Sequence, residues 1–119
     1  DAAALLPTEL CGMRAVGVND RFRCYRYTPG QRFAPHFDGA FVRQDGARSL
    51  LTFMVYLNEG FEGGTTAFLD YDVAAIPQAV TALLFQHMLL HGGVAVVAGG
   101  VTCLVVVRGA RACWGARAV

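Results

Sequence analysis

The clearest pattern of apolar and polar positions lies at residues 49–58, where the two kinds alternate. The odd positions are apolar: Leu51, Phe53, Val55 and Leu57. The even positions carry polar groups: Thr52, Tyr56 and Asn58. Alternation with a period of two predicts a β-strand. We expect its apolar side to face a core and its other side to line a cavity.

Shorter apolar runs, separated by turn residues, predict further strands on both sides of this one. They lie at residues 21–28, 32–38, 65–69, 81–87 and 101–107. Residues 8–14 depart from this pattern and fit a short N-terminal helix. Six or so short strands joined by turns predict an all-β fold of the sandwich, barrel or jelly-roll type.

The composition is that of one folded domain. The chain has 119 residues, of which 55% are hydrophobic and 16% are charged. This length supports a single core, and this hydrophobicity excludes intrinsic disorder. The formal net charge is +1, so electrostatics gives no indication of binding to nucleic acid or to an anionic membrane. We therefore expect one domain over residues 1–119.

Residues 73–107 contain no Asp, Glu, Lys or Arg, which raises the question of a membrane span. A spanning helix needs about 20 consecutive apolar residues. Here Pro77, several polar residues and two glycine pairs interrupt the stretch. No window fits such a helix, so we expect short buried strands and no membrane span.

The start of the chain and its cysteines bear on the compartment. The first residues lack the basic region and apolar core of a signal peptide. The chain begins with Asp1 rather than Met, so we expect a piece of a longer protein. The four cysteines have no C-x-x-C spacing, which favours free thiols over disulfides or a zinc site. The cytoplasm is slightly favoured, and the oligomeric state is left open.

A candidate metal site begins at His36 and Asp38. Residues i and i+2 of an extended segment point to one side, so this imidazole and this carboxylate converge. A second histidine would complete a two-His-one-carboxylate triad, the ligand set of non-haem Fe(II) oxygenases. The remaining histidines are His87 and His91, at and after the end of a predicted buried strand.

Three blocks of residues follow one another in a recognisable order. The first is Arg23-x-Tyr25-Arg26-Tyr27-x-x-Gly30-x-x-Phe33-x-x-His36-x-Asp38-Gly39. The second is Ser49-x-Leu51-Thr52, Tyr56-Leu57-Asn58 and Phe61-Glu62-Gly63-Gly64-x-Thr66-x-Phe68. The third is Pro77, Leu83-Leu84-Phe85-Gln86-His87 and His91-Gly92-Gly93. Over about residues 18–99 the chain resembles the prolyl 4-hydroxylase-like Fe(II)/2-oxoglutarate-dependent dioxygenases.

The resemblance implies a double-stranded β-helix, which is a variant of the jelly roll. It also implies that His36, Asp38 and His91 bind Fe(II), with His87 as the alternative to His91. His91 is preferred because a glycine follows two positions later, as it does in the family. Tyr27 and Thr52 would lie near the bound 2-oxoglutarate.

The implied activity is that of a dioxygenase that uses 2-oxoglutarate and O2, with ascorbate keeping the iron reduced. It would hydroxylate a substrate carbon and release succinate and CO2. In this family the substrate is commonly a prolyl residue in a peptide or protein. The residues themselves do not distinguish that substrate from another residue or a small molecule.

Residues 100–119 depart from the family pattern. The family places a Lys or Arg nine or ten positions after the distal histidine to hold the far carboxylate of 2-oxoglutarate, and this chain has Gly100 and Val101 there. Three explanations are open. Arg108 or Arg26 enters the pocket instead, or the C-terminal sequence results from a frameshift or mis-splicing. In the third explanation the domain has lost turnover and only binds a metal or a peptide.

Overall fold

The computed structural model describes residues 7–18, 23–99, 102–107 and 112–115 of the chain. These residues form thirteen β-strands and no helix. The longest strands have six residues. The predicted all-β fold of short strands is therefore confirmed.

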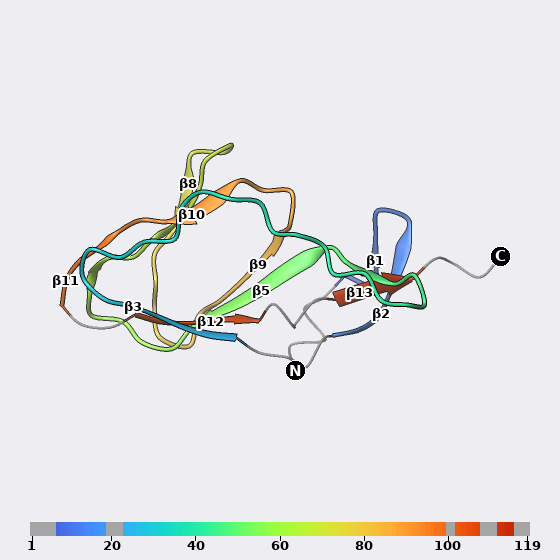
Figure 1. Ribbon diagram of the computed structural model, residues 1–119, viewed down its shortest axis with the longest axis horizontal. Helices are drawn as coiled ribbons and strands as arrows, with labels where there is room; N and C mark the ends of the chain where they lie inside the picture. The colour runs from blue at the N-terminus through green and yellow to red at the C-terminus, as the bar shows by residue number, and fades with distance from the viewer. Residues whose placement is uncertain (1–6, 19–22, 100–101, 108–111, 116–119) are drawn as a thin grey trace.

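A four-stranded antiparallel sheet forms one wall of the molecule. Its order is β3 (Arg23–Tyr27), β12 (Thr102–Val107), β5 (Leu51–Tyr56) and β9 (Ala82–Gln86). In β12, Leu104 pairs with Tyr25 on one side and with Tyr56 on the other. The sheet thus depends on pairing between segments that lie far apart in the sequence (Figure 1).

Two smaller sheets lie across from this wall (Figure 1). One has the order β10 (His91–Gly93), β7 (Thr66–Phe68) and β8 (Val73–Ala75), and the other pairs β11 (Val96–Ala98) with β6 (Glu62–Gly63). A further sheet of β1 (Glu9–Leu10), β2 (Met13–Val18), β13 (Ala112–Gly115) and β4 (Arg48–Ser49) lies at the far end. The facing walls give the jelly-roll-like arrangement that was expected.

Strand β5 shows how side chains are distributed between the interior and the outside. Thr52, Met54 and Tyr56 are buried, and Tyr56 has no exposed surface. Thr52 and Met54 line a cavity, so the prediction that one side of this strand lines a cavity is confirmed. Phe53 and Val55 on the other side remain partly exposed. The apolar side is therefore less covered than the sequence pattern predicts.

The prediction of a short helix at residues 8–14 is wrong. The structure has a hairpin there, in which β1 and β2 pair Leu10 with Met13. The two turn residues, Cys11 and Gly12, have positive φ angles of 51° and 73°, as in the tight turns that join antiparallel strands. Strand β2 also pairs with β13. Pairing with a distant strand therefore outweighs the local tendency toward a helix.

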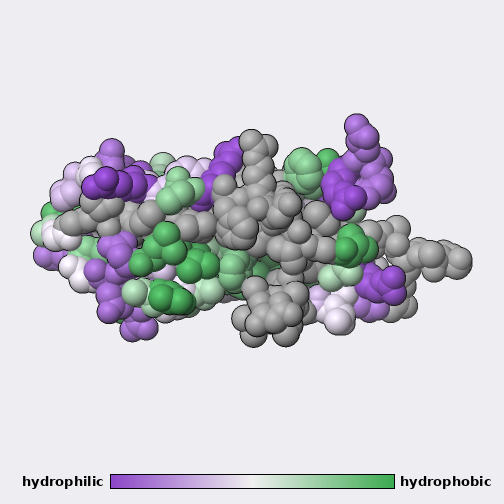
Figure 2. Space-filling model, turned by 90° about the horizontal axis from the view of Figure 1, so that it is seen from below, coloured by the Kyte–Doolittle hydropathy of each residue, from purple (hydrophilic) through white to green (hydrophobic). Residues whose placement is uncertain are grey.

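The uncharged stretch at residues 73–107 contributes strands β8 to β12, as expected. Among the described residues, no helix has the length and apolar character needed to cross a membrane. Many apolar side chains of this stretch are nevertheless exposed, including Ile76, Val80 and Met88. Figure 2 shows apolar side chains gathered in patches among hydrophilic ones on one face of the molecule.

Candidate metal centre

Two of the predicted ligands, His36 and His91, lie side by side because their backbones are hydrogen-bonded to each other. The His36 amide donates to the His91 carbonyl at 2.9 Å, and the His91 amide donates to the His36 carbonyl at 3.1 Å. This isolated bridge is the only β-pairing in the segment 32–38. The strand predicted there does not extend further, in part because Pro35 has no N–H to donate.

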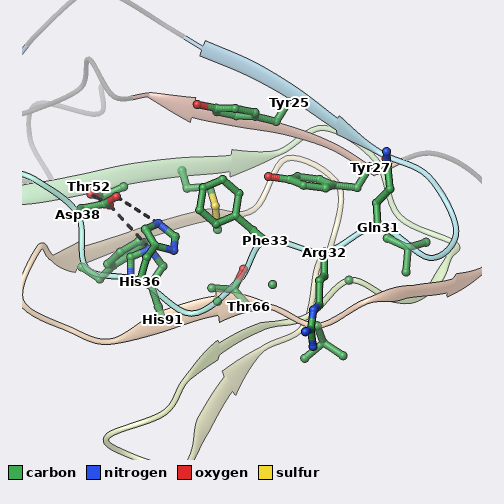
Figure 3. A pocket seen from close by; sticks show the side chains of 17 residues that line it. Tyr25, Tyr27, Gln31, Arg32, Phe33, His36, Asp38, Thr52, Thr66 and His91 are labelled. Carbon is green, nitrogen blue, oxygen red and sulfur yellow. Dashed lines mark hydrogen bonds and ion pairs between the residues drawn. The ribbon is translucent and has the colours of Figure 1, made fainter.

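Asp38 approaches the two histidines from the end of the same segment. Its amide donates to the His87 carbonyl at 3.2 Å, and the hydroxyl of Thr52 donates to its carboxylate. Only 9% of its side chain is exposed. Strand β5 thus helps to hold the carboxylate beside the imidazoles (Figure 3).

The possible metal-binding atoms of His36, Asp38 and His91 lie close together. His36 Nε2 lies 3.5 Å from Asp38 Oδ1, and His91 Nε2 lies 3.8 Å from Asp38 Oδ2. One ligand atom from each residue lies within 4.8 Å of the others. A divalent cation bound at about 2.0–2.2 Å from each atom fits this spacing.

The second ring nitrogen of each histidine contacts a backbone carbonyl. His36 Nδ1 lies 3.0 Å from the Ala34 oxygen, and His91 Nδ1 lies 2.9 Å from the Leu89 oxygen. Because a carbonyl only accepts, Nδ1 is the donor in both contacts, and Nε2 is the ring nitrogen that lies toward Asp38. Burial lowers the pKa of His91, which favours the neutral ring. Two Nε2 atoms beside a carboxylate are an arrangement that can bind a metal ion.

His87, the alternative distal ligand, lies outside this cluster of described residues. Its side chain is buried. Its amide donates to the Leu50 carbonyl at 3.0 Å, and its own carbonyl accepts from Asp38. The backbone of His87 therefore positions a predicted ligand, while His91 is the histidine that lies with His36.

A cavity opens beside the three side chains, and aromatic rings form part of its wall. Tyr25 and Tyr27 stack with their ring centres 6.5 Å apart, and Phe33 meets them edge-on at 6.4 and 6.5 Å. All three residues line the cavity, as was predicted for Tyr27 alone. Burial, and to a lesser extent the neighbouring Tyr25, raises the pKa of Tyr27. Its hydroxyl therefore stays protonated near neutral pH and can donate.

Several residues that line the cavity were not predicted as site residues: Tyr25, Arg32, Phe33, Thr66 and Phe85. A signal existed for Tyr25, because it lies two positions before Tyr27 on one strand and shares its side. Thr66 was predicted as part of a strand, but its hydroxyl contacts that of the buried Tyr56 at 2.6 Å. Phe33 and Arg32 lie outside the strands, where no periodic pattern indicates direction.

The basic residues suggested as partners of 2-oxoglutarate are not among the described residues of the cavity wall. Arg26 lies on β3, is exposed and does not line the cavity. Arg108 lies outside the described residues, as do Gly100 and Val101.

A jelly-roll-like fold that brings two histidines and an aspartate together beside a cavity defines the class of non-haem iron oxygenases. The model of the 2OG-Fe(II) oxygenase superfamily matches residues 22–115. The chain belongs to this superfamily of 2-oxoglutarate-dependent dioxygenases. A search of curated protein sequences gives no match.

Solved structures of prolyl hydroxylases are similar to this chain. The viral collagen prolyl hydroxylase of Paramecium bursaria Chlorella virus-1, in its 2OG complex, gives a TM-score of 0.55 at 25% identity, covering 82% of this chain and 61% of the viral chain. A Pseudomonas putida prolyl-4-hydroxylase gives a TM-score of 0.50 at 24% identity, covering 86% of this chain and 54% of the bacterial one. The chain thus spans less than two thirds of either protein. Both structures share the fold of this chain, and the similarity to the viral enzyme agrees with the expected resemblance to prolyl hydroxylases.

Proposed function

We propose that this domain is an Fe(II)- and 2-oxoglutarate-dependent dioxygenase that hydroxylates a prolyl residue in a peptide or protein, with succinate and CO2 as co-products. The observation that carries the proposal is the convergence of His36, Asp38 and His91 beside a cavity. Two imidazoles and one carboxylate leave open positions on one side of a bound iron. The superfamily match over residues 22–115 supports the same activity.

His36, Asp38 and His91 would hold Fe(II), which, when bound, supplies the activation of O2 that is coupled to the oxidation of 2-oxoglutarate. The chain's own residues orient these ligands. Thr52 donates to the carboxylate, and backbone carbonyls fix both imidazoles through Nδ1. The ring of Phe85 lies 4.6 Å from that of His91 and excludes water from this side of the site.

The cavity wall supports the choice of the other ligands. Tyr27 is proposed to donate to a carboxylate of 2-oxoglutarate, because it lines the cavity and its phenol is protonated near neutral pH. Thr52 belongs to the same pocket through its bond to Asp38. The aromatic faces of Tyr25 and Phe33 suit the apolar ring of a prolyl residue. The similarity to a viral collagen prolyl hydroxylase supports that substrate class, and ascorbate is the proposed reductant.

Anaerobic titration of the Fe(II)-loaded protein with 2-oxoglutarate tests the proposal. We expect a metal-to-ligand charge-transfer band, followed by succinate once O2 and a prolyl peptide are added. His36→Ala and Asp38→Ala should abolish both signals, because each substitution removes one of three ligands. The absence of the band in the wild-type protein at millimolar 2-oxoglutarate would contradict the proposal.

The assignment of the distal ligand is tested by a matched pair of variants. His91→Ala should lose the band, whereas His87→Asn should keep it, because His87 lies outside the cluster. The opposite result would make His87 the ligand. Circular dichroism of each variant confirms that the fold is retained.

A second function, a domain that binds a metal or a peptide without turnover, is favoured by one observation. The chain has Gly100 and Val101 where the family has Lys or Arg. A domain of this kind would bind the metal in the same titration but give neither the charge-transfer band nor succinate.

A further inference from the structure

The cavity has one cation that forms no ion pair with a described residue. Arg32 is the only Lys or Arg among the described residues that line the cavity, and Asp38 is their only acid. Asp38 is already in contact with Thr52 and with the two predicted histidine ligands. Within the same part of the chain, the only arginine in an ion pair is Arg43. The cavity therefore carries a positive charge that none of the described residues neutralises through an ion pair.

The backbone holds Arg32 at this position from both sides. The Val96 amide donates to the Gln31 carbonyl at 3.1 Å, and the Gly93 amide donates to the Phe33 carbonyl at 2.9 Å. Arg32 is thus fixed between a contact with β11 and a contact with β10. Figure 3 shows its guanidinium directed away from the tyrosine rings of the opposite wall. The backbone position from which this side chain extends is therefore set by the fold.

Among the described residues, the remainder of the cavity offers an anion neutral donors such as the Tyr27 hydroxyl, but no second Lys or Arg. Its wall includes Met54, Phe85, Val94 and Val96 as well as the aromatic cluster. The side-chain oxygen of Gln31 accepts from Thr28, so this amide can offer an anion only its N–H donors, which are neutral. A carboxylate that leaves water for such a space needs a charged partner. A guanidinium supplies one with two parallel N–H donors.

We propose that Arg32 is the carboxylate-binding residue of this cavity. This inference rests on the proposed function, because that function brings carboxylates into the cavity. The carboxylate is either the distal one of 2-oxoglutarate or one carried by the substrate peptide. In both cases Arg32, which lines the cavity, takes a role that Arg26, which does not line it, cannot take.

Calorimetric titration of the anaerobic Fe(II)-loaded protein separates the two sources. One arm compares 2-oxoglutarate with 2-oxobutyrate, a 2-oxo acid that lacks the distal carboxylate. The other arm compares two prolyl peptides that differ only by Glu or Gln next to the proline. Arg32→Met is the test variant and Arg26→Met is the matched control. Arg32→Lys keeps the charge without the paired donors.

If Arg32 binds the distal carboxylate, Arg32→Met should bind 2-oxoglutarate about 10- to 100-fold more weakly, with 2-oxobutyrate unchanged. If it binds a substrate carboxylate, the same loss should appear for the Glu peptide and not for the Gln peptide. Arg32→Lys should restore part of the affinity, and Arg26→Met should resemble the wild type. The proposal is overturned if Arg32→Met changes neither preference, or if the wild type has no preference in either arm.

The proposed function fails in a different way. A wild-type protein that binds Fe(II) but no 2-oxo acid would contradict the dioxygenase activity, and the peptide arm would still decide the role of Arg32. Iron binding by Arg32→Met is measured alongside, because Arg32 is not a ligand and its loss should leave the metal affinity unchanged.

Discussion

At the scale of single residues, the orientation of the predicted ligands depends on atoms that are not ligands themselves. The carbonyls of Ala34 and Leu89 hold the two imidazoles, and the hydroxyl of Thr52 holds the carboxylate. Such partners fix which ring nitrogen is free to bind a metal. In both His36 and His91, the ring orientation is thus set by the backbone carbonyl two residues earlier in the chain.

The buried His91 makes the stability of the metal-free protein depend on pH. Burial lowers its pKa in the folded state from the ordinary value of 6.5. Below that value the unfolded chain binds more protons than the folded one, so the free energy of unfolding falls as the pH falls. Urea denaturation in the presence of a chelator, from about pH 8 to pH 5, should show this decline.

His91→Gln is the control for that measurement. It cannot titrate, so its free energy of unfolding should fall less steeply over the same range. An equal slope for the variant and the wild type would show that His91 is not responsible.

The sequence predicted the site residues that are linked by local geometry and missed those that are not. His36 and Asp38 were predicted because a separation of two residues places both side chains on one side of an extended chain. The choice of His91 needed the family resemblance, since no local rule relates positions 36 and 91. Arg32 and Phe33 were missed because their direction depends on bonds to β10 and β11.

At the scale of elements, alternation predicted the strands but not their partners. The pattern at residues 49–58 predicted β5, and the structure confirms it. The position of β12 between β3 and β5 is set by pairing across distant parts of the chain, which no local pattern contains. The same limit explains the error at residues 8–14, where a hairpin replaces the expected helix.

The pairing of β6 with β11 depends on a glycine. Gly63 has a φ angle of 83°, and a Cβ atom there would lie 2.1 Å from the Ala95 carbonyl oxygen. Gly63→Ala should therefore lower the free energy of unfolding by about 2 kcal/mol or more. Gly39→Ala is the matched control, because a Cβ at Gly39 meets nothing within 4 Å. Similar denaturation midpoints for the two variants would contradict this prediction.

At the scale of the whole molecule, the candidate metal site joins segments from three parts of the chain. His36 and Asp38 come from a segment with little regular structure, His91 comes from β10, and Thr52 from β5. The two facing walls therefore meet at this point. An ion bound there contacts groups that only the folded chain brings together, so its binding energy adds to the stability of the fold.

Metal binding should accordingly raise the melting temperature. At a free metal concentration of about 100 times Kd, the stabilisation is about 2.7 kcal/mol, which corresponds to an increase in Tm of about 10 °C for a domain of this size. Scanning calorimetry with Fe(II) under anaerobic conditions, or with Mn(II), measures it. His36→Ala should show no increase, and a Tm independent of metal in the wild type would contradict the assignment of the site.

The reciprocal hydrogen bonds between positions 36 and 91 have a consequence for how this site can change. They join backbone atoms only, so they do not depend on which side chain stands at the two positions, proline excepted because it has no N–H. Replacing a ligand therefore alters the coordinating group while the frame that carries it remains intact. In evolution, the residues that bind the metal can therefore change while the fold is kept. In protein design, the metal-binding side chains can be exchanged here without rebuilding the scaffold.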